Sequence, residues 1–122
     1  MSSQYEKTHA TTVIAAVDLL PNRFVALNGQ YAPATSTGGL TDVVGVSETE
    51  ARQGEAVSVV TGYSYPVELG VAVTIGEYLK PGTDGMADVG TVGDRCAIAL
   101  EAGAAGDVIE AHLLQHIHGD DD

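Results

Sequence analysis

The residues of this chain best suited to bind a metal ion lie at its C-terminal end, in the stretch HLLQHIHGDDD. Imidazole and carboxylate groups are common ligands of Zn²⁺ and other divalent ions, so His112, His116, His118 and the aspartates form a candidate site. A strand through His116 and His118 would place both rings on one face, whereas a helix would pair His112 with His116. A polar chain end after a last strand is usually a solvated tail, and a small metal-binding protein is therefore an alternative interpretation only.

The single cysteine, Cys96, excludes an internal disulfide. A thiolate beside a histidine would be a nucleophile, but Cys96 belongs to the alternating apolar run RCAIAL, which predicts a buried packing residue. Asp84, Asp88 and Asp94 lack the ligand spacing and the glycine of an EF-hand loop, so they are interpreted as turn residues. The sequence has no P-loop, nucleophile-elbow or H-E-x-x-H motif, and no catalytic residue is assigned.

Lys80 points to a different chemistry, because strand-Gly-acid-x-Leu patterns like that of GVAVTIGEYLKPG occur in lipoyl and biotinyl carrier domains. In those domains an exposed turn lysine carries the cofactor. Lys80 precedes Pro-Gly, however, and it lacks the Asp or Met that normally stands before the modified lysine. A carrier module is thus a second alternative, and we expect no cofactor.

The net charge narrows the class of partner. Seventeen acidic residues against five basic ones give a formal charge of −12, which repels phosphate backbones and anionic headgroups. We therefore expect no binding to nucleic acid or to a membrane surface. The scarcity of lysine is also expected of proteins that work in very high salt, where at about 1 M the Debye length is roughly 3 Å. An acidic protein from ordinary conditions is the other interpretation.

Turn residues recur along the chain at intervals typical of an all-β fold. The run RFVAL stops at Asn28-Gly29, TDVVGV follows a stretch of Thr, Ser and Gly, and EAVSVVTG stops at Gly62. PVELGVAV and DRCAIALEAG are further runs of strand length. We predict an all-β domain, a small barrel or sandwich of short strands with little helix. The best helical candidate is SETEARQ at 47–53, where Ser47 and Glu50 fit a capping box, and a bulged loop is nearly as good an interpretation.

Alternation within two runs predicts which residues share a face. In GEAVSVVTG, Val57 and Val59 lie opposite Ser58 and Val60, so both faces are expected to contact protein. In the run 95–102 a bulky row (Cys96, Ile98, Leu100) lies opposite a row that includes two alanines. Small residues opposite a bulky row are typical either of close sheet packing or of an interface with another subunit.

From about Arg23 onward the chain resembles the small capsid decoration, or cement, proteins of tailed viruses of bacteria and archaea. The resemblance is an ordered pattern of turns that covers most of the chain. It includes Gly-Glu-x-Val-x-Val at 54–59, Gly-Glu-x-Leu at 76–79, Ala-Leu-Glu-Ala at 99–102 and Gly-Asp-x-Ile at 106–109. The strong acidity, the GYSYP segment before Val67 and the His- and Asp-rich end depart from the family pattern.

The resemblance implies a non-enzymatic structural protein of the virion. It implies docking on the outer surface of the capsid, with the major capsid protein as partner and with self-association as a homotrimer. Such a protein stabilises the head against the pressure of packaged DNA. It is made in the host cytoplasm, and the absence of a signal-peptide pattern or a long apolar run agrees with that expectation.

The domain organisation expected from the sequence has three parts: an arm at 1–16, a β-rich domain at 17–116 and an acidic tail at 117–122. We expect the arm to contact the capsid by adding an extended strand to a capsid sheet edge, through Tyr5, Thr11, Val13 and Ile14. The alternative is that residues 11–17 form the first strand of the protein's own domain.

Overall fold

The computed structural model describes residues 10–34, 43–62, 64–91, 93 and 95–113. These residues form nine strands and one short 3-10 helix, η1, and no described helix has the length and hydrophobicity needed to cross a membrane. The prediction of an all-β fold with little helix is confirmed. The strands are β2 (Ala10–Ile14), β3 (Phe24–Val25), β4 (Gly45–Ser47), β5 (Ala56–Val60), β6 (Ser64–Glu68), β7 (Tyr78–Pro81), β8 (Ala87–Val89), β9 (Ala97–Ala99) and β10 (Val108–Leu113), with η1 at Thr83–Gly85.

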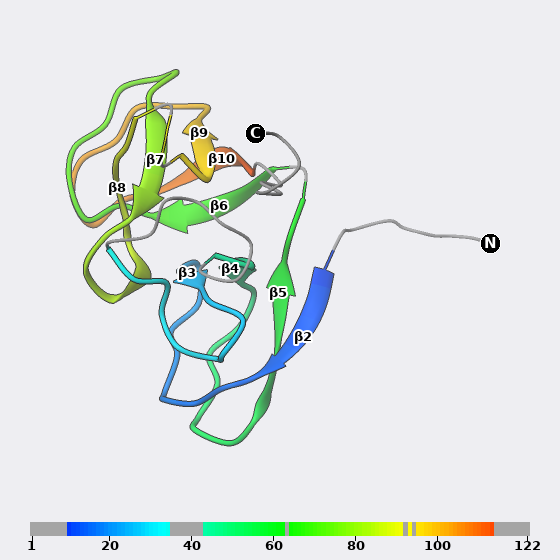
Figure 1. Ribbon diagram of the computed structural model, residues 1–122. Helices are drawn as coiled ribbons and strands as arrows, with labels where there is room; N and C mark the ends of the chain where they lie inside the picture. The colour runs from blue at the N-terminus through cyan, green and yellow to red at the C-terminus, as the bar shows by residue number, and fades with distance from the viewer. Residues whose placement is uncertain (1–9, 35–42, 63, 92, 94, 114–122) are drawn as a thin grey trace.

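The strands form two antiparallel sheets, one from each half of the chain (Figure 1). In the first half, which we define as the described residues between 10 and 60, the strand order is β2-β5-β4-β3. In the second half, residues 64–113, the order is β6-β10-β9-β7-β8. The first four strands of the second sheet repeat the order and connections of the first sheet. The chain therefore contains the same four-stranded unit twice, and β8 is an addition at the edge of the second unit.

Turns of one kind lead into β5, β7 and β10, and they explain the recurring Gly-acid pairs of the sequence. The third residue is a glycine with positive φ: +92° at Gly54, +88° at Gly76 and +91° at Gly106. Residues with a Cβ atom rarely adopt a positive φ, so glycine is favoured at this position. The acidic fourth residue accepts a hydrogen bond from the N–H of the first. These bonds join Arg52 to Glu55 (2.8 Å), Thr74 to Glu77 (2.8 Å) and Ala104 to Asp107 (2.9 Å).

In the second half, the ends of two strands bind these turns reciprocally. The carbonyl of Ala99 accepts from the N–H of Gly76 (2.8 Å), and the N–H of Ala99 donates to the carbonyl of Glu77 (2.9 Å). Leu69, directly after β6, makes the same pair of bonds with the turn at 104–107 (2.7 and 2.8 Å). The end of β9 therefore fixes the turn at 74–77, and the end of β6 fixes the turn at 104–107.

The first half repeats this arrangement. Ala15 binds the turn at 52–55 through the same two backbone bonds (2.7 and 2.9 Å), and Ser47 binds a turn at 20–23 (2.9 Å for both bonds). An antiparallel bridge between Leu19 and Ala51 joins the two turns, as the bridge between Val73 and Gly103 does in the second half. The two halves thus agree in backbone hydrogen bonding as well as in strand order.

The turn at 20–23 differs from the other three in its side chains. Its third residue is Asn22, with φ +64°, and its fourth is Arg23, which cannot accept the bond that an acid accepts. The N–H of Leu20 instead donates to the hydroxyl of Tyr31 (2.9 Å). The Ser47 hydroxyl accepts from the N–H of Arg23 (3.2 Å) and donates to the carbonyl of Leu20 (2.7 Å). Ser47 therefore completes a turn whose own sequence lacks the acid.

The two halves also place their buried residues at equivalent positions. One apolar cluster lies within the first half, and a larger cluster lies within the second half and extends into the first. Equivalent pairs in the two clusters are Val13 and Val67, Ala15 and Leu69, Leu19 and Val73, Val25 and Leu79, Val44 and Cys96, Val57 and Ile109, and Val59 and Ala111. Burial of a single valine or leucine side chain stabilises a fold by about 1.5–3 kcal/mol, so each half has a core of its own.

The structure corrects one prediction and bears on another. The helix expected at 47–53 is wrong: Ser47 ends strand β4, Ala51 forms the bridge to Leu19, and the turn at 52–55 begins directly afterwards. The Ser47 hydroxyl, which would cap such a helix, instead forms hydrogen bonds with the turn at 20–23. Residues 10–14, assigned from sequence to an arm at 1–16, form β2 and pair with β5 along five residues. The tail predicted at 117–122 lies outside the described residues.

Candidate interaction surfaces

The described residues that suggested metal, nucleophile or carrier chemistry have different surroundings. His112 is exposed on β10, Cys96 is buried in the core of the second half with 4% of its surface exposed, and Lys80 lies within β7 opposite Asp88. Lys80 is thus in mid-strand rather than at a turn apex, and its ammonium lies 3.5 Å from the carbonyl of Ala34. The buried packing role predicted for Cys96 agrees with its position.

No group of three or more potential metal ligands is found among the residues that the structure describes. His116, His118 and Asp94 lie outside those residues, as does Tyr5. A hollow of about 270 Å³ lies in the second half, lined by Gly70, Val71, Gly82, Thr83, Met86, Ala87 and Asp88.

The predicted contact residues on β2 differ in their exposure to solvent. Val13 is buried with 6% of its surface exposed and belongs to the core of the first half. Thr11 and Ile14 are exposed, and Ile14 keeps 60% of its surface accessible. Since β2 is at the edge of the sheet that the described strands form, Thr11 and Ile14 are accessible to a partner protein, whereas the Val13 side chain is not.

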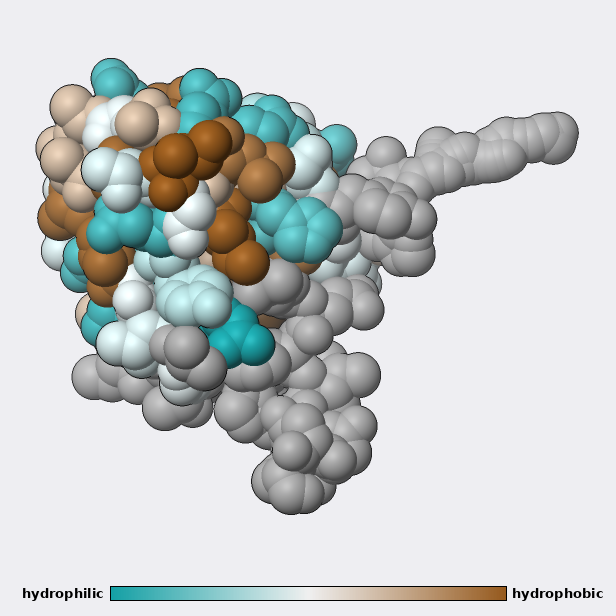
Figure 2. Space-filling view, turned by 90° about the horizontal axis from the view of Figure 1, so that it is seen from above, coloured by the Kyte–Doolittle hydropathy of each residue, from teal (hydrophilic) through white to brown (hydrophobic). Residues whose placement is uncertain are grey.

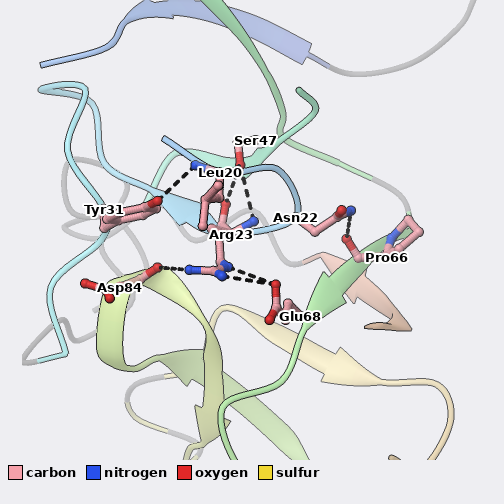
Figure 3. Close-up of polar contacts among 8 residues, drawn as sticks. All are labelled: Leu20, Asn22, Arg23, Tyr31, Ser47, Pro66, Glu68 and Asp84. Carbon is pink, nitrogen blue, oxygen red and sulfur yellow. Dashed lines mark hydrogen bonds and ion pairs between the residues drawn. The ribbon is translucent and has the colours of Figure 1, made fainter. Parts of the chain in front are cut away.

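A polar seam centred on Arg23 joins the two halves (Figure 3). Arg23 is buried, and both its Nε and its Nη2 donate to Glu68 Oε1, at 3.2 and 3.1 Å. Its Nη1 donates to the carbonyl of Asp84 at 3.1 Å, and the guanidinium lies 6.0 Å from the centre of the Tyr31 ring. Planar guanidinium groups suit this use, because they donate in several fixed directions at once.

Asn22 extends the seam along the free edge of β6. Its carbonyl accepts from the N–H of Glu68 (2.9 Å), and its side-chain amide donates to the carbonyl of Pro66 (2.9 Å). Two consecutive residues of one turn thus cover the edge of β6, which would otherwise present unpaired backbone groups. Beside the seam, Tyr65 lies against the shared core, and its burial together with the charge of Glu48 raises the pKa of its hydroxyl.

Apolar contacts accompany the seam. Phe24, Val46 and Val60 project from the first sheet into the larger cluster, and none is more than 1% exposed. The sequence indicated only that both faces of β5 contact protein, which is confirmed. It did not identify Arg23 or Asn22, because the signal is a difference from the other three turns and can be recognised only once those turns are aligned.

The residues on the equivalent outer face of the second sheet are exposed or half-buried. Along β10, exposed or half-buried residues (Val108, Glu110, His112) alternate with buried ones, and Ile98 stands between the buried Ala97 and Ala99. Of the bulky row in the run 95–102, Ile98 and Leu100 thus face outward, whereas Cys96 is buried together with Ala97 and Ala99. Figure 2, a view from above, shows apolar side chains gathered on the visible face of the molecule. In the second half, Ile75, Leu100 and Val108 are 70%, 43% and 52% exposed.

Comparisons with known proteins identify the fold. No family model matches the chain, and no curated protein is significantly similar to it in sequence. Among solved structures, the chain is similar to the N base of the head fiber protein gp8.5 of bacteriophage phi29, with a TM-score of 0.67. The match covers 93% of this chain and 99% of the other at 15% identity. It shows that the two chains share a fold over nearly their whole length.

Proposed function

We propose that this protein is a structural protein of a viral head, a decoration protein that binds the outer surface of the major capsid protein lattice as a homotrimer. The observation that carries the proposal is the match of almost the whole chain to the base of a phage head fiber. The resemblance of its turn pattern to capsid decoration proteins supports the same conclusion independently. The protein acts by clamping neighbouring capsid subunits rather than by catalysis.

The high acidity fits this role. A net charge of −12 keeps a densely covered particle dispersed, and linked contacts allow each copy to bind weakly. A trimer that contacts several capsid subunits exceeds the one-site affinity by about 10² to 10⁴. We expect occupancy to fall at low salt, because repulsion between carboxylates on neighbouring copies is then unscreened. Occupancy that is constant from about 1 M to about 0.1 M salt would contradict this electrostatic account.

We place part of the capsid contact in the N-terminal segment, at Tyr5 and its neighbours. Deleting residues 1–16 would remove β2, including its five-residue pairing with β5 and the buried Val13, so such a variant tests folding rather than binding. Deletion of residues 1–9 leaves β2 intact. This shorter variant should fold as the full chain does and should occupy capsid sites less completely.

The test uses heads from which the protein has been removed. The full chain, the variant without residues 1–9 and a Tyr5→Ala variant are each added back, and occupancy is measured by cryo-electron microscopy. Restored density on the outer capsid surface and greater resistance of the heads to heat would support the proposal. Absence of binding by the folded full chain would refute it, and full occupancy by the shortened chain would refute the role of the N-terminal segment alone.

A further inference from the structure

The joint between the two halves uses one face of the first sheet. Phe24, Val46 and Val60 form a row across β3, β4 and β5, because Val46 pairs with both Phe24 and Val60. This row is buried against the second half. The turn that precedes it supplies Asn22 and Arg23, which bind the edge of β6. We call these residues the docking face of the first half.

The second half has an equivalent face, and none of the described segments covers it as the second half covers the docking face of the first half. Tyr78, Ile98 and His112 form the equivalent row across β7, β9 and β10, since Ile98 pairs with both Tyr78 and His112. Tyr78 and Ile98 are half-buried and His112 is exposed, whereas their counterparts in the first half are fully buried. The guanidinium carbon of Arg95 lies 5.3 Å from the centre of the Tyr78 ring, at the end of this row.

The first half likewise has an unused copy of the surface that receives the docking face. In the second half that surface includes Pro66 and Glu68 on β6. The register of β2 with β5 matches that of β6 with β10, because Ile14 lies opposite Ala56 as Glu68 lies opposite Val108. Ile14 is therefore the counterpart of Glu68, and Thr12 is the counterpart of Pro66. Both are exposed.

We propose that copies of this chain associate head to tail. The row Tyr78, Ile98 and His112, which we call the docking face of the second half, binds the β2 edge of the next copy, which is the surface that includes Thr12 and Ile14. The occupant is a second copy because the chain already buries this same pair of surfaces against each other once, between its own halves. A contact between two different surfaces leaves one of each free, so it continues until the rotation per copy closes a ring. The inference rests on the proposed function only for the number of copies, which is three. A closed ring of three copies contains six equivalent halves.

The contact between copies is expected to be weaker than the joint within the chain. Glu77 and Ile14 occupy the positions of Arg23 and Glu68, so the buried ion pair has no counterpart. Tyr78 and Ile98 supply apolar surface, and polar groups surround them, as is typical of interfaces between separately folded proteins. In this arrangement Thr11 and Ile14 contact a neighbouring copy, and residues before β2, including Tyr5, are left to contact the capsid.

The test is sedimentation velocity on the purified full chain and on single variants, each checked for native circular dichroism. Ile98→Asp alters the docking face and Ile14→Asp alters the β2 edge, while Val17→Asp adds the same charge at an exposed site outside both surfaces and serves as the control. His112→Asp, at an exposed position, replaces Ile98→Asp if the latter fails to fold. The full chain and the control should form one oligomer, and the two interface variants should be monomers.

An equimolar mixture of Ile98→Asp and Ile14→Asp decides the geometry. Each variant retains the surface that the other has lost, so head-to-tail contact predicts a dimer of one copy of each that grows no further. A symmetric contact between two docking faces predicts instead that Ile14→Asp remains oligomeric by itself. That result would overturn the proposal. A monomeric full chain would overturn it as well, and so would an oligomer that neither Ile98→Asp nor His112→Asp affects. Because no capsid is present, these outcomes are separate from failure of head binding.

Discussion

Replacement of Arg23 by alanine should destabilise the protein more than any other change of a charged residue in the described chain. The substitution removes three hydrogen bonds from a buried guanidinium and leaves the Asp84 carbonyl and the Glu68 carboxylate without their partner. Loss of one partner of a buried ion pair costs about 3–5 kcal/mol. The Glu68 side chain keeps 28% of its surface exposed, so water compensates it partly, and we expect a loss of about 3 kcal/mol.

The chain has no tryptophan, so unfolding is best followed by circular dichroism in urea. A loss of about 3 kcal/mol corresponds to a fall in Tm of roughly 10 °C for a domain of this size. Arg52→Ala is the matched control, since Arg52 is exposed at the start of an equivalent turn, and its effect should stay below about 0.5 kcal/mol. Glu68→Gln keeps an acceptor for Arg23 and should lie between these values.

Equal effects of Arg23→Ala and Arg52→Ala would refute a stabilising role of the polar seam. A loss of less than about 1 kcal/mol for Arg23→Ala, which is the cost typical of an arbitrary substitution, would refute it too. Either result would mean that the apolar row of the first sheet joins the halves without help from the polar seam.

Three further predictions follow from particular contacts. Gly29→Ala should cost several times more stability in urea unfolding than Gly106→Ala: both have positive φ, worth about 1–2 kcal/mol, but only at Gly29 would a Cβ lie 2.0 Å from a carbonyl oxygen of β2. Equal losses would contradict this. Ser47→Ala should cost about 1–3 kcal/mol, because its buried hydroxyl completes the turn at 20–23, and the same change at half-buried Ser58 should cost less. The pKa of Tyr65 is raised, so the folded state holds this proton more tightly than the unfolded state, and stability should be lost as pH rises above the usual tyrosine pKa of about 10. Ultraviolet titration should show a late-ionising component that Tyr65→Phe removes; an unchanged titration would disprove the assignment.

Several features of the fold were determined by the sequence itself. Valine-rich runs cut by Gly, Asn and Pro predicted short strands, because branched residues favour extended backbone and turn residues end it. The Gly-acid pairs at 54–55, 76–77 and 106–107 marked real turns, since the glycine adopts positive φ and the acid caps the turn. Local chemistry was sufficient for these features because each depends on residues only a few positions apart.

Other features depended on contacts between distant residues, and only the tertiary structure decided them. The capping-box pattern at 47–53 predicted a helix, yet Ser47 serves a turn formed by residues far earlier in the chain. Alternation in the run 95–102 placed Cys96 with Ile98 and Leu100, yet Cys96 is buried beside Ala97 and Ala99, because burial there depends on the neighbouring strands β7 and β10. The duplication leaves few identical residues, because a core requires only apolar side chains of suitable volume at equivalent positions. Hydrogen bonds between turns and distant strand ends, which sequence patterns do not encode, are what made the two units recognisable as copies.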